Sequence, residues 1–347
     1  MDDEVYGQRD RSRVTLHDVA RAAGVSKSTV SRMLDERLPK SDSEKVRRVR
    51  RIADELGYVR DVSASNLRRG NTGMIGVIVP RLTDTVMAML YEAFARAAAR
   101  SGQFVIVATT DDVPGADRRA ADRLLGRGVD GLVLATARDG DDFLRELTRR
   151  EVPFVLALRH NGSSLASVGD DRLGGYLATR HLTDLGHRRI GLLTGPDYAT
   201  SARGRVAGYK RAMEEAGFGI TPDLLVPSSF SIESGEAATR SLLQLPERPT
   251  AIFAVNDNTA IGALSAIARA GLSVPGDISL VGYNDVPIVG HLPVPLTTVR
   301  VPFDQIALAA LDLLTETNVP EGEHLRIAIP TLIPRQSTAR CVESDPS

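Results

Sequence analysis

Residues 14–35 read VTLHDVARAAGVSKSTVSRMLD and hold two short amphipathic segments separated by Gly-Val-Ser. Thr15 is placed to cap a first helix, and Gly24 supplies the backbone freedom that ends it. Apolar residues at helical spacing predict one buried face for this helix: Leu16, Val19, Ala20 and Ala23. Ser26 is placed to cap a second helix over about 27–34. Two helices this short bury little surface alone, so we expect the pair to present one helix to a partner.

A third helix is expected to start after Ser41 or Ser43 and to stop at Gly57. Its apolar residues would complete a small core: Val46, Val49, Ile52, Ala53 and Leu56. Three short helices around a small core, with a glycine-containing turn between the first two, describe a helix-turn-helix unit.

The second helix is predicted to present hydrogen-bonding side chains to the outside: Lys27, Ser28, Thr29, Ser31 and Arg32. Duplex DNA offers phosphate oxygens along its backbone and purine acceptors in its major groove. We predict base contacts from Lys27, Ser28 and Arg32. We predict phosphate contacts from hydroxyl-bearing residues: Thr15, Ser26, Thr29 and Ser31. The alternative is a plain helical hairpin with a polar outer face.

The distribution of charge supports a polyanionic partner for this part of the chain. The whole chain has a net charge of −1, yet residues 11–70 carry 15 Lys and Arg against 8 Asp and Glu. Residues 71–347 carry 27 Lys and Arg against 32 Asp and Glu. A basic head on a mildly acidic body indicates nucleic-acid binding, although a solvated helical surface is the simpler alternative.

From Met74 onward the pattern changes to short apolar runs that alternate with helix-like segments. The runs are MIGVIVP, FVIVATT, GLVLAT, FVLAL, IGLLTG, AIFAV and ISLVGY. Unbroken apolar strands alternating with helices indicate parallel sheets covered on both faces. Two such units, about 73–170 and 171–298, predict an α/β domain of two lobes. A ligand cleft is expected beyond the carboxyl ends of the strands.

Several classes of protein are disfavoured by what the sequence lacks. No apolar run approaches about 18 residues, and MDDEVYGQRD at the start is polar, so we expect no membrane span and a cytoplasmic location. The single cysteine, Cys341, excludes an internal disulfide. His181 and His187 have no partners that complete a metal set, and no nucleophile or phosphate-loop motif occurs. We expect no metal and no cofactor; an enzyme and an exported binding protein are the second and third hypotheses.

The quoted stretch, continued by KVRRVRRIADELGYVRDVSASNLRRGNTGMIGVIVP, resembles the N-terminal region of the LacI/GalR (lactose-repressor) family of bacterial transcription regulators. The resemblance implies a helix-turn-helix headpiece at 13–60, a hinge helix and linker at 61–72, and a periplasmic-binding-protein-like effector and dimerisation domain at 73–340. It also implies that the chain crosses back between the lobes. Lobe one is then 73–170 with 301–330, and lobe two is 171–298 with 331–340.

The resemblance implies that paired hinge helices of a homodimer enter the minor groove of a near-palindromic operator. Leu67 then wedges a central base step, with Ala64 and Arg68 beside it. The hinge of the family usually reads Ala-Arg-Ser-Leu, whereas this chain has Ala64-Ser65-Asn66-Leu67. The alternative for Leu67 is an ordinary linker leucine.

The resemblance also implies which residues bind the effector: Arg205, Phe230, Asn256, Asn284 and Asp170. The alternatives are a surface salt bridge for Arg205 and core packing for Phe230. The sequence leaves open whether Asn284 or Asp285 faces the cleft. Two departures alter the expected cleft wall, because Asp84-Thr85-Val86-Met87 replaces an Asn-Pro-aromatic segment and Leu158 replaces an acid.

We therefore expect a repressor at the nucleoid whose operator affinity is switched by a small molecule, with a sugar as the first hypothesis. A nucleobase or another metabolite, and an activator in place of a repressor, are the alternatives. The segment CVESDPS after Arg340 is too short for a heptad bundle, so a dimer is expected rather than a tetramer.

Overall fold

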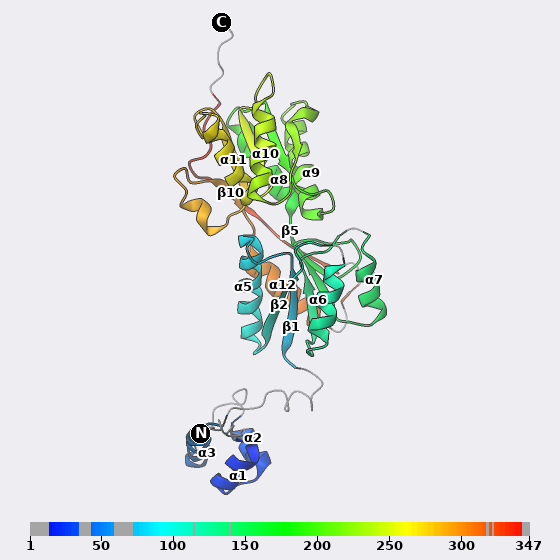
Figure 1. Cartoon of the computed structure of the whole chain (residues 1–347), viewed down its shortest axis with the longest axis vertical. Coiled ribbons are helices and arrows are strands. Elements are labelled where there is room, and N and C mark those ends of the chain that lie inside the picture. Colours follow the sequence, from blue (N-terminus) through cyan, green and yellow to red (C-terminus); the bar gives the residue numbers. More distant parts are fainter. Residues whose placement is uncertain are drawn as a thin grey trace, which may run out of the picture. The chain divides into compact units, whose positions relative to one another are not determined.

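The chain divides into two compact units between Thr72 and Gly73. The computed structural model describes residues 14–34, 43–58, 72–113, 115–138, 140–316, 319–320 and 323–341 (Figure 1). The described part of the first unit is helical, and the second unit contains two mostly parallel sheets with helices packed on them. The predicted fold class, a helical headpiece with a two-lobed α/β domain, is confirmed.

The described part of the first unit contains the helices α1 (Leu16–Ala23), α2 (Lys27–Met33) and α3 (Glu44–Glu55). Thr15 caps α1 through a reciprocal pair of bonds with Asp18, whose carboxylate accepts from the Thr15 backbone N–H at 2.9 Å. Gly24 ends α1 at φ 65°, a left-handed conformation that glycine adopts without strain. Ser26 caps α2 by accepting from the Thr29 backbone N–H at 3.2 Å. The predicted turn between two capped helices is confirmed.

One small apolar core joins these three helices: Val19, Ala20, Ala23, Val30, Val49 and Ala53. Val30 is the fully buried residue of α2, so the opposite side of this helix is left to solvent. The prediction that Leu56 is buried is wrong. Leu56 is 39% exposed because α3 ends one residue earlier and Leu56 only caps it.

The first lobe of the second unit is built on a parallel sheet. Its strands, in spatial order, are β11 (Leu325–Ala328), β5 (Ala166–Gly169), β4 (Phe154–Ala157), β3 (Gly131–Leu134), β1 (Met74–Val79) and β2 (Phe104–Thr109). The helices that cover it are α5 (Thr85–Arg100), α6 (Ala116–Leu125), α7 (Asp142–Arg149) and α12 (Phe303–Thr315).

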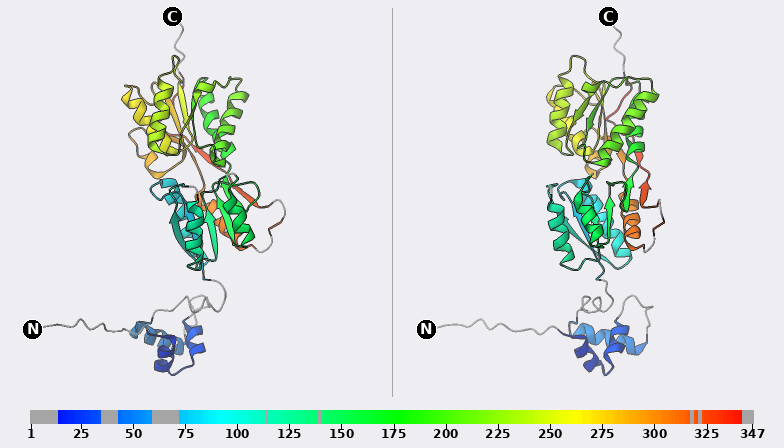
Figure 2. Two further views of the ribbon diagram at one scale, coloured as in Figure 1. Left: turned by 45° about the vertical axis from the view of Figure 1, so that its right-hand side comes forward. Right: turned by 90° about the vertical axis from the view of Figure 1, so that its right-hand side faces the viewer.

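Strand β1 shows why these runs are apolar without alternation. Val77 and Val79 pack with residues of α5 and α12, whereas Ile78 packs with residues of α6 and α7. All three side chains are 0% exposed. Each face of the sheet therefore carries a pair of helices, as a parallel sheet requires (Figure 2).

The second lobe repeats this plan with one antiparallel edge strand. Its strands, in spatial order, are β12 (Thr331–Ile333), β10 (Thr297–Arg300), β9 (Ser279–Asn284), β8 (Ala251–Ala254), β6 (Ile190–Thr194) and β7 (Leu225–Pro227). Its helices are α8 (Asp171–Asp184), α9 (Thr200–Glu215), α10 (Ile232–Leu243) and α11 (Asp257–Arg269), with 3-10 turns η1 (Pro222–Leu224) and η2 (Pro287–Gly290).

The chain crosses between the lobes after β5, after β10 and after β11. The structure assigns α12 and β11 to the first lobe and β12 to the second. Strand β10 extends to Arg300, two residues beyond the expected limit of 298. Three connections of this kind allow the lobes to move about a hinge while each keeps its own sheet. Within the described ranges, no helix is both long enough and apolar enough to cross a membrane.

The helices of the second lobe approach each other closely through glycine. A Cβ atom on Gly208 of α9 would lie less than 3.0 Å from the carbonyl oxygen of Arg172 in α8. A Cβ atom on Gly175 of α8 would come equally close to the carbonyl oxygen of Arg205 in α9. The two backbones are therefore in contact, which fixes Arg205 against the start of α8 at the carboxyl edge of the sheet.

Candidate functional site

The exposed face of α2 carries the side chains that the sequence predicts for DNA contact. Lys27, Ser28, Ser31 and Arg32 are exposed, and Thr29 is half-buried. Arg32 lies in the last turn of the helix. The buried Val30 anchors the helix from the other side, so the polar face is held in one orientation.

Some of the hydroxyls predicted to contact phosphate also have local partners. The Thr15 Oγ1 donates to the Asp18 carboxylate at 2.6 Å, and this bond lowers the pKa of Asp18. The Ser26 Oγ lies 2.7 Å from the Thr29 Oγ1 and 2.9 Å from the Ser28 Oγ. These residues therefore build the helix ends in addition to any contact with DNA. The hinge residues Ala64, Leu67 and Arg68 lie outside the described residues.

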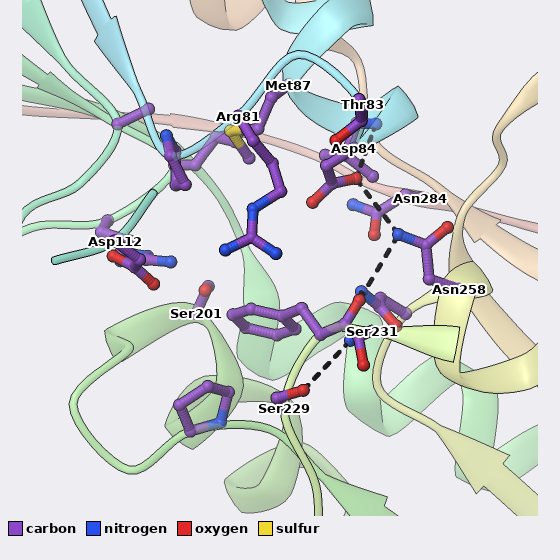
Figure 3. Close-up of a pocket in the computed structure, with 18 of the residues that line it drawn as sticks. Arg81, Thr83, Asp84, Met87, Asp112, Ser201, Ser229, Ser231, Asn258 and Asn284 are labelled. Carbon is purple, nitrogen blue, oxygen red and sulfur yellow. Dashed lines mark hydrogen bonds between the residues drawn. The ribbon is translucent and has the colours of Figure 1, made fainter. Parts of the chain in front are cut away.

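A cavity of about 500 Å³ lies between the two lobes (Figure 3). Its wall comes from the loops that follow the carboxyl ends of strands in both sheets, as expected for parallel α/β folds. Four of the predicted effector residues line it: Arg205, Phe230, Asn256 and Asn284. Asp170 is not among the lining residues; its carboxylate caps α8 by accepting from the Leu173 backbone N–H at 2.8 Å.

Arg205 is largely occupied by protein partners. Its Nε donates to Asp171 Oδ1 at 2.8 Å, and its Nη1 donates to the Val255 carbonyl at 2.6 Å. Its guanidinium also lies 3.7 Å from the centre of the Tyr283 ring. The residue is 6% exposed, so it forms a buried ion pair rather than the surface salt bridge considered from the sequence.

The two asparagines differ in how freely they face the cavity. Asn256 caps α11, accepting from the Thr259 backbone N–H at 2.8 Å, and donates to the Phe230 carbonyl at 3.0 Å. Asn284 lines the cavity, whereas its neighbour Asp285 turns away to pair with Arg300 and Arg335. The ambiguity between residues 284 and 285 is thereby resolved in favour of Asn284.

Further residues that line the cavity were not predicted from the sequence: Arg81, Asp112, Arg159, Tyr198 and Asn258. Four of them follow the ends of strands, Arg81 after β1, Asp112 after β2, Arg159 after β4 and Tyr198 after β6. These four residues could have been predicted from the rule that ligands bind at the carboxyl ends of parallel strands.

Hydrogen bonds cross directly from one lobe to the other around the cavity. Asn258 Nδ2 donates to Asp84 Oδ1 at 3.2 Å (Figure 3), and Tyr198 Oη donates to Asp112 Oδ2 at 2.6 Å. Burial raises the pKa of Asp84, and the backbone N–H of Val86 opposes that shift. These contacts join the lobes at the cavity itself.

A buried carboxyl lies between two residues of the cavity wall in the sequence, Asn256 and Asn258. Asp257 is 0% exposed and accepts from the Val286 N–H at 2.8 Å and from Thr298 Oγ1 at 2.7 Å. Burial raises the pKa of Asp257 to about 7. Asn256 caps α11, and Asp257 ties the first turn of this helix to Val286 and to strand β10. Across the described ranges, no cluster of three or more His, Cys, Asp or Glu could hold a metal ion.

A helix-turn-helix unit together with a two-lobed ligand cleft defines a ligand-responsive DNA-binding regulator. Residues 15–61 match the family model described as bacterial regulatory proteins, lacI family. Residues 179–338 match the model described as periplasmic binding protein-like domain.

Similar proteins cover nearly the whole chain. The ribose operon repressor of Escherichia coli is 34% identical over 304 residues, which are 86% of this chain and 92% of that repressor. The transcriptional repressor PurR of Photobacterium profundum is 31% identical over 93% of this chain and 98% of its own length. This chain belongs to the LacI family of bacterial transcriptional regulators.

Solved structures agree with this assignment. The Lac repressor dimer bound to operator and the anti-inducer ONPF superposes with a TM-score of 0.82 at 29% identity, covering 94% of this chain and 100% of that one. The transcriptional regulator CelR in complex with cellobiose gives a TM-score of 0.71 at 28% identity, with coverage of 94% and 100%.

Proposed function

We propose that this regulator is a repressor that binds a near-palindromic operator as a homodimer and changes its affinity when a small molecule occupies the cavity between its lobes. The single observation that carries the proposal is the combination of an exposed polar α2 with a cavity of about 500 Å³ in one chain. The similarity to the ribose operon repressor and to the operator-bound Lac repressor dimer supports it.

In this proposal α2 lies in the major groove of the operator. Lys27, Ser28 and Arg32 contact base edges, and Arg32 is suited to a bidentate bond with guanine O6 and N7. The hydroxyls contact phosphates: Thr15, Ser26, Thr29 and Ser31. The exposure of Lys27, Ser28, Ser31 and Arg32 supports these roles.

The hinge is proposed to act by the wedge mechanism that the family resemblance implies. Two Leu67 side chains of the dimer unstack a central base step, with Ala64 and Arg68 beside them. Leu67→Ala is therefore expected to reduce DNA bending and specific affinity. The dependence of affinity on salt should change little, because that slope counts phosphate contacts.

We propose a sugar as the effector, held by Arg205, Phe230, Asn256 and Asn284. The support comes from similar proteins, among them a LacI family regulator of Enterococcus faecium solved with bound ribose, at 29% identity and a TM-score of 0.68. An aromatic face beside amide groups fits a polyhydroxylated ring. Asp170 is not part of this proposal, because it caps α8 outside the cavity wall.

Switching is proposed to follow closure of the lobes around the effector. The contacts from Asn258 to Asp84 and from Tyr198 to Asp112 already join the lobes at the cavity rim. A coupling of roughly 1 to 3 kcal/mol between cavity and DNA is enough to change operator occupancy. We propose that the protein acts as a regulator without enzymatic activity, in the cytoplasm.

The test is selection of genomic DNA fragments by the purified full-length protein, with and without candidate metabolites. Recovery of a common near-palindromic site, released or retained when a sugar is added, is the expected result. A double variant that combines Lys27→Ala and Arg32→Ala serves as the negative control. It should recover no common site, because it lacks two of the proposed base contacts. Recovery of fragments with no shared sequence by the unmodified protein would count against the proposal.

A further inference from the structure

Arg159 is a buried arginine in the cavity wall that lacks a protein partner for part of its charge. It follows strand β4, lines the cavity and is 4% exposed. Its Nη1 is inaccessible to solvent and has no hydrogen-bond partner in the described part of the chain. Burial lowers the pKa of Arg159, which reflects the cost of holding this charge away from water.

Holding an unpaired cation away from water costs free energy, so a buried arginine is expected to have an anionic partner. Arg205 in the same cavity provides the contrast, because Asp171 and the Val255 carbonyl satisfy two of its nitrogens. Among the described residues no acid forms an ion pair with Arg159, although the charge of the nearby Asp112 opposes the lowering of the Arg159 pKa. Its guanidinium instead lies 5.5 Å from the centre of the Tyr198 ring and 5.9 Å from that of Phe230.

The acidic residues of the cavity wall are either bonded to residues other than Arg159 or exposed to solvent. Asp112 accepts from Tyr198 Oη at 2.6 Å and pairs with Arg138 at 3.1 Å. Asp84 caps α5 and accepts from Asn258 at 3.2 Å. Glu233 is exposed, where water and salt screen its charge.

A second cation approaches the same space. Arg81 comes from the loop after β1, and its guanidinium extends into the cavity toward the residues of the opposite lobe (Figure 3). Within the ranges that the structure describes, the Arg81 Nη2 has only a long bond of 3.4 Å to the Asp111 carbonyl. Guanidinium groups bind carboxylates and phosphates through paired, charge-assisted hydrogen bonds.

We infer that the effector carries an oxyanion, a carboxylate or a phosphate, and that Arg159 binds it, with Arg81 closing over the anion from the loop after β1. This inference rests on the proposed function insofar as it takes the cavity to be the effector site. It narrows the effector class from any sugar to acidic sugars, sugar phosphates and metabolites of like charge.

The first experiment uses inorganic phosphate as the probe and thermal unfolding of the full-length protein as the readout. Phosphate should raise the unfolding midpoint relative to chloride at equal ionic strength. Arg159→Gln should lose this increment, and Arg145→Gln, which removes an exposed arginine of α7, should keep it. An equal increment in all three proteins, or none in the unmodified one, would overturn the inference.

The unfolding midpoint of Arg159→Gln without ligand is a second readout. It should change in the opposite direction if the arginine served only to stabilise the fold. Removing an unpaired buried charge relieves its desolvation cost, so Arg159→Gln should unfold at the same or a higher temperature than the unmodified protein. A structural arginine would instead lower the unfolding midpoint when removed. A marked loss of stability in Arg159→Gln without ligand would therefore contradict the inference.

The second experiment distinguishes a carboxylate from a phosphate on the effector. It uses three compounds that differ only at carbon 6: glucose, glucuronate and glucose 6-phosphate. Their binding is measured by calorimetry, together with ribose and ribose 5-phosphate. We expect an anionic member to bind at least about tenfold tighter than its neutral counterpart, and Arg159→Gln to remove that preference. Glucuronate points to a carboxylate, and the phosphorylated sugars point to a phosphate.

The outcomes distinguish this inference from the proposed function. Neutral sugars that bind best and alter operator affinity would overturn the anion inference and leave the regulator intact. Anions that bind through Arg159 without changing the affinity for a selected operator would uphold the site and contradict its role in switching.

Discussion

Tyr198 of the second lobe donates a hydrogen bond from its hydroxyl to Asp112 of the first lobe, and the two oxygens lie 2.6 Å apart. Arg138 lies over the Tyr198 ring at 4.0 Å from its centre and pairs with the same carboxylate at 3.1 Å. Burial and the neighbouring Asp112 raise the pKa of Tyr198, so its hydroxyl remains a donor at neutral pH. This contact ties the lobes together at the rim of the cavity.

Tyr198→Phe should therefore favour separation of the lobes. The variant loses a bond to a charged group, which is worth about 1 to 2 kcal/mol when half-buried. Ligand affinity should fall by roughly 5- to 30-fold, because a ligand that binds the closed lobes must first restore that arrangement. Calorimetry measures the affinity, and small-angle X-ray scattering reports any expansion of the ligand-free protein.

Tyr176→Phe is the matched control for this prediction. Tyr176 Oη donates to Glu215 at 2.8 Å, a bond of the same kind that lies within the second lobe. Its loss should leave ligand affinity unchanged. An equal loss of affinity in both variants would show that the Tyr198 contact has no special role between the lobes.

Arg32→Ala should reduce preference for the operator while leaving weak binding to unrelated DNA nearly unchanged. A bidentate contact from arginine to guanine discriminates by roughly 1 to 3 kcal/mol, about 5- to 150-fold in affinity. Fluorescence anisotropy with operator and scrambled duplexes measures the ratio. Arg211→Ala, an exposed arginine of α9 that pairs with Glu215, should retain full preference. Uniform weakening on both duplexes would instead assign Arg32 to a phosphate.

The headpiece and the two-lobed body were predictable because both depend on local patterns. Gly24 and Ser26 mark the turn whatever surrounds them, and runs such as MIGVIV are apolar because both faces of a parallel sheet are covered. The burial of Leu56 was predicted wrongly because periodicity does not fix the last turn of a helix.

The cavity was only partly predictable, because its contacts depend on how two lobes meet. The pairs Asn258 with Asp84 and Tyr198 with Asp112 join segments that are distant in sequence. Their geometry follows from the three crossings, which no local pattern specifies. Arg159 follows strand β4, where ligand contacts are expected, but the burial of its Nη1 without a hydrogen-bond partner could not be read from the sequence.

Asp257 should make the stability of the body depend on pH. Its pKa is about 7 in the folded chain and near 3.8 when unfolded, so the folded state holds the proton more tightly. Stability from this group is complete below about pH 4 and is lost as the pH rises toward 7. Between pH 5 and pH 8, this carboxyl should lower the free energy of unfolding by about 2 to 3 kcal/mol.

The pH prediction is checked by urea unfolding of Asp257→Asn and the unmodified protein at both pH values. The asparagine variant should lose most of the decrease, because it carries no titrating group there. Asp277→Asn is the control, since Asp277 is exposed and hydrogen bonds from Ser273 lower its pKa. A decrease that persists unchanged in Asp257→Asn would assign the pH dependence to another group.

Gly208→Ala should destabilise the second lobe despite the higher helix propensity of alanine. The new methyl group would lie less than 3.0 Å from both the Arg172 carbonyl oxygen and the Tyr176 nitrogen, so α8 and α9 must separate. Overpacking of backbone against backbone costs roughly 3 kcal/mol, which exceeds the gain of about 1 kcal/mol from propensity. Thermal unfolding should show a lower midpoint, and separation of α9 from α8 should also strain the bond from Arg205 to Asp171.

Gly219→Ala tests whether that loss comes from the close approach. Gly219 has no atom within 4 Å of an added Cβ and no left-handed backbone, so the substitution should be neutral or slightly stabilising. Because Arg205 depends on the same helix contact, Gly208→Ala should weaken ligand binding and Gly219→Ala should not. A Gly208→Ala protein with unchanged midpoint and ligand affinity would mean that α8 and α9 can separate without cost, and that the packing of these helices does not position Arg205.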